Sequence, residues 1–280
     1  MEDFSIDVGG GMTFRARAAG PGDGRLVVLL HGFPQTSRSW FETMTALGDA
    51  GHRAVAFDQR GYSPGARPAG VESYGLDPLV ADVMAVADEL GAHRFDLVGH
   101  DWGGAIAWHV AGRHADRVRT LTVASTPHPL AFRAALRGEL GGDQQSKSGY
   151  VALFRSEAAE EFFLGNDAAA LRGLYSALPA EAAEEYVAVL SQPGALTAAL
   201  NYYRATSFDD QPAVGELTSP TLYVWSTDDM ALGREAAEAT GSHVTGPYRF
   251  EVLEGVSHWV PEAAPADFSR LLLEHLAAHP

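Results

Sequence analysis

Short apolar runs, half of them ended by Gly, His or Asp, constrain the fold of this chain more than any other feature. They are rich in β-branched residues and lie at 26–30, 54–57, 95–98, 118–124, 222–225 and 250–253. Such runs are typical of parallel strands that are buried on both faces. Helical patterns at 79–90 and 105–114 separate several of them, so the sequence predicts a doubly wound α/β sheet. Segments 4–8 and 12–18 flank three glycines and predict an opening antiparallel hairpin.

A long helical insertion interrupts this alternation after Pro127-His128-Pro129. The chain from there to about residue 210 is rich in Ala, Glu and Leu and has no strand pattern. We therefore expect a core of residues 1–128 and 211–280, with a helical cap of residues 129–210. Such a cap would lie over the carboxyl ends of the strands, where open α/β sheets bind their ligands.

The charge and residue content exclude several classes of function. Acidic residues outnumber basic ones by 36 to 20, and the formal net charge of −16 opposes binding to nucleic acid or an anionic membrane. A neutral substrate is expected. The chain has no cysteine, which excludes disulfides, thiol nucleophiles and Cys-ligated zinc. The first residues lack a signal-peptide pattern and no apolar stretch could cross a bilayer, so we expect a cytoplasmic protein.

Motifs for metals and nucleotides are weak. One pair of histidines, His275 and His279, has the His-x-x-x-His spacing of a ligand pair. The segment Gly141 to Ser148 resembles a phosphate loop only loosely, because Ser146 stands where the second glycine is needed. We expect neither a cofactor nor a metal, and we interpret 141–148 as a flexible linker in the cap.

The strongest local signal is the segment Gly99-His100-Asp101-Trp102-Gly103-Gly104, between a predicted strand and a predicted helix. It has the glycine-x-nucleophile-x-glycine pattern of a sharp strand-to-helix turn, with Asp101 in the position of the nucleophile. Glycines leave room for such a turn, and the amino terminus of the next helix favours an anion. Taken alone, the segment equally permits Asp101 to be an ordinary helix N-cap.

Two further segments supply partners for Asp101. His31-Gly32-Phe33-Pro34 directly follows the strand 26–30, in the position of a loop that contributes one N–H to an oxyanion hole. The two donors would be the N–H groups of Phe33 and Trp102. His258 follows the last predicted strand, in the chain order nucleophile, acid, base. The acid is Asp228 or Asp229, and the local pattern leaves both open.

Together these segments resemble the α/β-hydrolase family, and specifically its epoxide hydrolase branch, over essentially the whole chain. The resemblance is carried by H-G-F-P-Q at 31–35, F-D-Q-R-G-Y-S at 57–63, G-H-D-W-G-G at 99–104, W-S-T-D-D at 225–229 and G-V-S-H-W-V-P-E at 255–262. It implies a mostly parallel eight-stranded sheet with helices on both faces and an inserted helical cap. The family's acid usually ends a Gly-x-x-Asp motif, and the spacing from Ser226 favours Asp229.

The resemblance extends into the cap, where epoxide hydrolases use two tyrosines to hydrogen-bond the epoxide oxygen. Tyr150-Val-Ala-Leu-Phe154 and Tyr202-Tyr203-Arg204 match the two cap segments, which implies this role for Tyr150 and Tyr203. The first segment departs from the family at Arg155, where a glutamine is expected.

We therefore expect a hydrolase that acts on ether bonds and converts a small, neutral, apolar epoxide and water into a vicinal diol. Attack on a saturated carbon by serine would leave an ether, whereas attack by Asp101 leaves an ester that water activated by His258 can hydrolyse. One alternative is a haloalkane or haloacid dehalogenase with the same nucleophile, although Phe33 replaces the asparagine that haloalkane enzymes commonly carry. Another is a non-catalytic, ligand-binding relative. The particular epoxide and the oligomeric state stay open.

Overall fold

The computed structural model describes residues 1–208 and 211–280 of the chain. One eight-stranded sheet has the strand order β1-β2-β4-β3-β5-β6-β7-β8. Its strands are β1 (Glu2–Asp7), β2 (Thr13–Ala19), β3 (Leu26–Leu30), β4 (Arg53–Phe57), β5 (Phe95–His100), β6 (Val118–Ala124), β7 (Thr221–Asp228) and β8 (Tyr248–Ser257). The pairs β1–β2 and β2–β4 are antiparallel and the other five pairs are parallel. The predicted fold class is confirmed.

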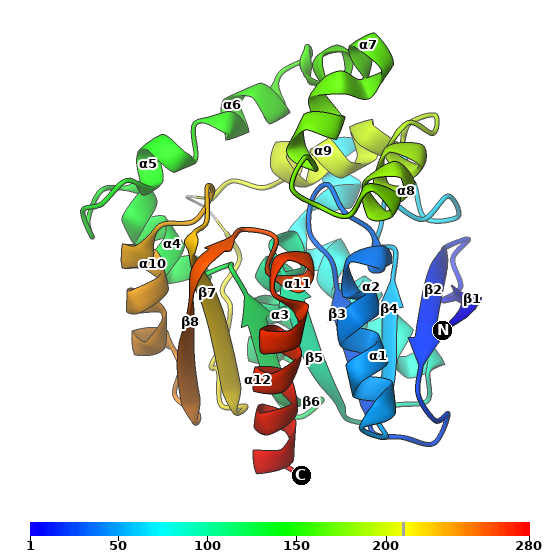
Figure 1. Cartoon of the computed structure of the whole chain (residues 1–280), viewed down its shortest axis with the longest axis vertical. Helices are drawn as coiled ribbons and strands as arrows, with labels where there is room; N and C mark the ends of the chain where they lie inside the picture. Colours follow the sequence, from blue (N-terminus) through cyan, green and yellow to red (C-terminus); the bar gives the residue numbers. More distant parts are fainter. Residues whose placement is uncertain (209–210) are drawn as a thin grey trace.

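Helices connect the strands and cover both faces of the sheet (Figure 1). They are α1 (Phe41–Asp49), α2 (Leu76–Glu89), α3 (Trp102–Arg113), α4 (Pro129–Leu136), α5 (Gln144–Lys147), α6 (Tyr150–Arg155), α7 (Ala159–Leu174), α8 (Ala180–Leu190), α9 (Ala195–Ala205), α10 (Arg234–Ala239), α11 (Val260–Ala263) and α12 (Pro265–Ala278). Short 3-10 helices are η1 (Ser37–Trp40), η2 (Val71–Tyr74) and η3 (Thr240–His243).

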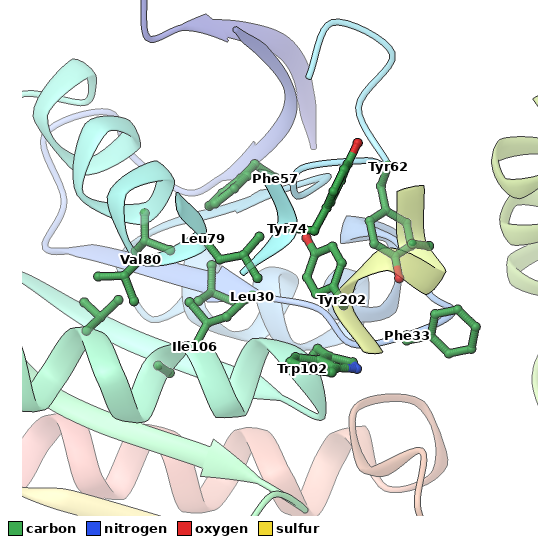
Figure 2. Close-up of a cluster of buried hydrophobic side chains, with 14 of the residues drawn as sticks. Leu30, Phe33, Phe57, Tyr62, Tyr74, Leu79, Val80, Trp102, Ile106 and Tyr202 are labelled. Atoms are coloured by element: carbon green, nitrogen blue, oxygen red, sulfur yellow. The ribbon is translucent and has the colours of Figure 1, made fainter. Parts of the chain in front are cut away.

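Alternation along the buried strands explains why both faces carry helices. Successive side chains of a strand point to opposite faces. In β3, Val28 and Leu30 belong to the cluster formed with α2 and α3, whereas Val27 and Leu29 belong to the cluster formed with α1 and α12. Figure 2 shows Leu30 beside side chains of α2 and α3. A strand that is apolar at every position therefore fills two cores at once.

Among the described residues between β6 and β7, helices are the only regular secondary structure, and no strand is present. Helices α6 to α9 lie beyond the carboxyl ends of the parallel strands, and α4 lies beside α10 (Figure 1). The expected boundary between cap and core, after residue 210, falls at residues 209–210, which lie outside the described part of the chain. The division at residues 129 and 211 stays a prediction.

Tyr202 fixes α9 to the layer below it (Figure 2). Its ring contacts Trp102 at 5.5 Å and Tyr74 at 6.1 Å between ring centroids. Its hydroxyl donates to the carbonyl oxygen of Arg60 over 2.8 Å. Aromatic contacts of this kind stabilise a fold by more than the burial of their apolar surface alone. These contacts thereby set the position of the next residue, Tyr203, relative to the sharp strand-to-helix turn at Asp101, which we call the elbow.

The structure corrects three local expectations. Strand β8 extends to Ser257, and α3 begins at Trp102 instead of residue 105. The interpretation of 141–148 as a flexible linker is wrong, because part of it forms α5. The buried side chain of Gln144 bonds to the main chain of Ala231 and Gly233, after β7. These long-range contacts have no signature in the local sequence.

Candidate active site

Asp101 lies at a strained turn between β5 and α3. Its backbone φ is 52° and ψ is −119°, a conformation that residues other than glycine rarely adopt and that concentrates at functional sites. It occupies the N-cap position of α3, yet its side chain makes no capping hydrogen bond. Instead, Oδ1 accepts the N–H of Phe33 over 2.7 Å. The turn therefore presents the carboxylate to the loop after β3.

Glycines let the two loops approach each other closely. A Cβ added at Gly32 would lie 2.3 Å from the Cβ of Asp101, and one at Gly103 would lie 2.2 Å from the carbonyl oxygen of Leu30. Neither position has room for a side chain. The same approach brings the Phe33 N–H to the carboxylate, and Thr126 adds a hydrogen bond of 2.7 Å to the carbonyl oxygen of Asp101.

His31 stabilises the loop that contains Phe33. Its Nε2 accepts the N–H of Gln59 over 3.1 Å, so Nδ1 carries the ring proton and faces the carbonyl oxygen of Gly32. Burial lowers the pKa of His31 to about 4. The ring is therefore neutral and supports the loop without adding charge to the site.

His258 lies between the two carboxylates, directly after β8. Its Nδ1 is 2.9 Å from Oδ2 of Asp229, and its Nε2 is 3.7 Å from Oδ2 of Asp101. The other oxygen of Asp229 accepts the N–H groups of Ala231 and Leu232 at 2.8 and 2.9 Å. Asp229 is thus the carboxylate that orients the imidazole, whereas Asp228 is exposed at the end of β7.

The three groups shift one another's ionisation. Burial alone would raise the pKa of Asp229, but His258 and the two N–H donors outweigh it and hold the pKa below its usual value. Burial alone would lower the pKa of His258, but Asp229 and then Asp101 raise it. Burial raises the pKa of Asp101, against the opposing effects of His258 and the N–H groups of Trp102 and Phe33.

A cavity of about 330 Å³ opens over Asp101 and His258. Tyr150 at the start of α6 and Tyr203 on α9 also line it. The rest of its wall is mainly apolar and includes Phe33, Leu153, Phe154, Phe162, Phe163 and Leu174. A second cavity of about 50 Å³ also reaches Asp101 and both tyrosines. The site suits an apolar molecule with one polar group at its centre.

Both tyrosine hydroxyls are protonated; Tyr203 is buried and Tyr150 is half-buried. Burial and the charge of Asp101 raise the pKa of Tyr150 and of Tyr203 well above the ordinary value. The Tyr203 ring packs edge-on against Phe33 at 5.3 Å and Trp102 at 5.1 Å between centroids. The side chain of Trp102 also hydrogen-bonds Tyr203. The structure therefore brings together every residue that the sequence analysis selected: Asp101, Asp229, His258, Tyr150, Tyr203, Phe33 and Trp102.

Several supporting residues were not selected. Gln35, His100 and Glu262 form a hydrogen-bonded row that ends at the main chain of His258. All three lie in the motifs quoted above, so their closeness in sequence to Phe33, Asp101 and His258 could have indicated that they support the site. Lys147 of α5 donates to the carbonyl oxygen of Asp229 over 2.6 Å. Nothing in the local sequence indicates that contact.

Comparison with known proteins gives a family match and many relatives. Residues 25–265 match the family model described as the alpha/beta hydrolase fold. The chain is similar to Epoxide hydrolase 4 of Mus musculus, with 35% identity over 91% of this chain and 74% of that protein. It is also similar to Epoxide hydrolase A of Mycobacterium tuberculosis, with 29% identity over 95% of this chain and 94% of that protein.

Solved structures agree over the whole fold. One, from a study of novel epoxide hydrolases in metagenomes from hot environments, has a TM-score of 0.88 and 31% identity and covers 100% of this chain and 99% of its own. Another, a Bacillus megaterium epoxide hydrolase in complex with an inhibitor, has a TM-score of 0.89 and 27% identity and covers 98% of this chain and 100% of its own. None of the helices in the described part of this chain has the length and apolar character needed to span a membrane.

Proposed function

Because the chain belongs to the α/β-hydrolase family, in its epoxide hydrolase branch, we propose that it hydrolyses small, neutral, apolar epoxides to vicinal diols. The observation that carries this proposal is the arrangement of one cavity. A carboxylate and an imidazole lie on its floor, and two protonated phenols face them from helices α6 and α9. We also propose that residues 129–210 form the cap that carries these phenols.

In the first step, Oδ2 of Asp101 attacks one ring carbon. The bond from that carbon to the ring oxygen breaks, and its electron pair goes to the oxygen. Oδ1 is engaged by the Phe33 N–H, which leaves Oδ2 as the attacking atom. The hydroxyls of Tyr150 and Tyr203 donate to the departing oxygen, and one supplies its proton. An ester of Asp101 and a neighbouring hydroxyl group result.

In the second step, His258 removes a proton from water, and the water oxygen attacks the ester carbonyl carbon of Asp101. Negative charge develops on Oδ1, where the N–H groups of Phe33 and Trp102 stabilise it. Asp229 holds Nδ1 of His258, so that Nε2 is the atom that accepts the proton. The intermediate collapses and the bond between Cγ and Oδ2 of Asp101 breaks, so Oδ2 leaves on the substrate carbon and takes the proton from His258 to give the diol. The carboxyl group left on Asp101 loses the second water proton, which restores the tyrosine hydroxyl that was used in the first step.

The same nucleophile would serve a dehalogenase, but the surroundings of Trp102 favour an epoxide. A departing halide needs N–H donors, whereas the Trp102 ring is packed edge-on against Tyr203, 5.1 Å between centroids. Phe33 offers no side-chain donor. The groups left to meet a departing atom are two hydroxyls, which suit an oxygen that must gain a proton.

A paired assay tests the proposal. The protein is incubated with styrene oxide, a cyclic epoxide and a fatty-acid epoxide, each scored for diol, and in parallel with haloalkanes and haloacids scored for halide. The proposal predicts diol from at least one epoxide and no halide. Halide release without diol would establish a dehalogenase. Absence of both products, with a ligand-induced rise in melting temperature, would favour a binding protein.

A further inference from the structure

A buried row of side chains joins Glu262 to the main chain of His258. The side-chain amide of Gln35 contacts Oε2 of Glu262 on one side and lies 3.1 Å from Nδ1 of His100 on the other. Nε2 of His100 lies 2.9 Å from the carbonyl oxygen of His258. Gln35 and His100 have no exposed surface. Each of their polar atoms must therefore be satisfied within this row.

The hydrogen bonds of this row need one more proton than is present when Glu262 is ionised and His100 is neutral. Counting donors and acceptors shows this. A carbonyl oxygen only accepts, so Nε2 of His100 carries a proton. A neutral ring then has an unprotonated Nδ1, which must accept from the amide nitrogen of Gln35. That orientation turns the amide oxygen of Gln35 toward Oε2 of Glu262, and two oxygens hydrogen-bond only if one carries a proton.

The opposite orientation of the Gln35 amide moves the extra proton to His100. This is the orientation in the structure, where the amide nitrogen of Gln35 points toward Oε2 of Glu262 and the amide oxygen faces Nδ1 of His100. Both ring nitrogens must then be protonated, which makes the ring an imidazolium. A half-turn about the last side-chain bond of Gln35 interconverts the two arrangements with almost no change in shape. The question is therefore which residue keeps the proton.

The surroundings place it on Glu262. Burial, together with the nearby His258, lowers the pKa of His100 to about 3. Burial raises the pKa of Glu262 to about 7, even though Tyr186, Gln35 and Arg38 oppose the shift. An imidazolium at His100 would also lie 4.9 Å, between ring centroids, from the imidazole of His258.

We propose that Glu262 is a neutral acid in the active protein and acts as a positioning residue for His258. Its carboxyl proton bonds to the Gln35 amide oxygen, the Gln35 amide donates to Nδ1 of His100, and the Nε2–H of His100 holds the carbonyl oxygen of His258. The same oxygen accepts from Ser125 and from the N–H of Val260. Loss of the Glu262 proton breaks the row at its far end and loosens the main chain that carries the imidazole.

The titratable and charged groups that face Glu262 come from two elements, α8 and η1, and from the segment after α7. The Tyr186 hydroxyl of α8 donates to Oε1 over 2.6 Å, and the Tyr175 ring after α7 lies 5.2 Å from the Tyr186 ring. Arg38 of η1 would favour the ionised form. It also lies 3.7 Å from Glu181 and 3.9 Å from Glu185, and these carboxylates offset its charge.

Infrared and NMR spectra test the proton directly and need no substrate. Wild-type protein at a pH only slightly below 7 should show the carbonyl stretch of a protonated carboxylic acid, and Glu262→Gln should remove that band. The matched control is Glu160→Gln, which removes a carboxylate paired with Arg204 and should leave the band in place. The nitrogen shifts of His100 should be those of a neutral ring protonated at Nε2. A band that survives in Glu262→Gln, or a doubly protonated His100, would overturn the proposal.

The wild-type protein provides the same test if Glu262→Gln fails to fold. With ¹³C-labelled glutamate, one carboxyl signal should titrate with a midpoint of about 7. Absence of such a signal would overturn the proposal.

A pH profile then tests the positioning role. In wild type, kcat should decline severalfold as the pH rises through the pKa of Glu262. Glu262→Gln keeps a neutral donor at every pH and should lack this decline, whereas Glu262→Ala should have a low kcat throughout. An identical alkaline decline in wild type and Glu262→Gln would contradict the role. Because the spectra do not depend on turnover, failure of the epoxide assay and failure of this proposal are distinguishable.

Discussion

The main-chain N–H of Phe33 donates a 2.7 Å hydrogen bond to Oδ1 of Asp101, so the two oxygens of this carboxylate are not equivalent. Oδ1 occupies the place where an oxyanion would form, and Oδ2 faces His258. One side chain can therefore attack through one oxygen and later carry negative charge on the other. The predictions below follow from this asymmetry and from the groups around it.

Removing either cap hydroxyl should slow the formation of the ester. Tyr203→Phe and Tyr150→Phe should each lower kcat/KM for an epoxide by on the order of 10- to 100-fold, and the double variant by more, because the ring oxygen loses its proton donors. Stopped-flow single turnovers measure this step. Tyr202→Phe is the matched control: it removes a hydroxyl bonded to Arg60, and should cost about 1 kcal/mol of stability without a comparable loss of rate. Equal losses in all three single variants would contradict the assignment.

The pKa of His258 should fall when Asp101 becomes an ester. In the free protein the Asp101 charge helps to raise this pKa, and esterification removes that charge. Ester hydrolysis needs the neutral imidazole, so its rate should drop as the pH falls through the lowered pKa. Comparing the pH dependence of single-turnover hydrolysis with an NMR titration of His258 in the free protein checks this. A hydrolysis pKa at or above the free-protein value would be inconsistent with the proposed order of steps.

The ionised form of Asp101 should set the acid limit of the first step. Burial raises its pKa above the ordinary value for aspartate, and the carboxylate is the nucleophile. The alkylation rate should therefore fall as the pH decreases through this raised pKa, at a higher pH than an exposed aspartate would give. Rapid-quench measurement of the ester across the acidic range provides the test. An alkylation rate that is constant down to the ordinary aspartate pKa would refute it.

Gly32→Ala should damage the site more than the fold. The added Cβ would lie 2.3 Å from the Cβ of Asp101, so either the Phe33 loop or the elbow must move. We expect a loss of about 1–3 kcal/mol in stability and a large drop in kcat, measured by thermal unfolding and diol formation. Gly22→Ala is the control, because its Cβ would meet nothing within 4 Å. Full activity in Gly32→Ala would show that the close approach is not required.

Local sequence pattern predicted the sheet and the order of the site residues for a physical reason. A strand buried on both faces must be apolar at every position, as in Leu26 to Leu30, and this pattern needs no knowledge of distant contacts. The elbow likewise shows in the sequence, since the glycines around Asp101 are required by close approach.

The remaining features could not be predicted, because they depend on contacts between residues that are far apart in the sequence. Local pattern does not distinguish the adjacent residues Asp228 and Asp229. Which of them contacts His258 depends on a turn in which Asp229 accepts the N–H groups of Ala231 and Leu232. Tyr202 and Tyr203 are neighbours with opposite surroundings, one packed on Tyr74 and one lining the cavity. Gln35, His100 and Glu262 come from three separate motifs. Their hydrogen bonds exist only once β3, β5 and α11 are assembled.

The most direct test of the central claim, that Asp101 is a carboxylate nucleophile, is the intact mass of His258→Gln after exposure to an epoxide. This variant retains Asp101 but lacks the base for hydrolysis, so the protein should gain the mass of one epoxide, and peptide mapping should place the adduct on Asp101. Asp101→Asn should turn over no epoxide, and the double variant should gain no mass. An unmodified His258→Gln protein, or an adduct on any other residue, would contradict the mechanism.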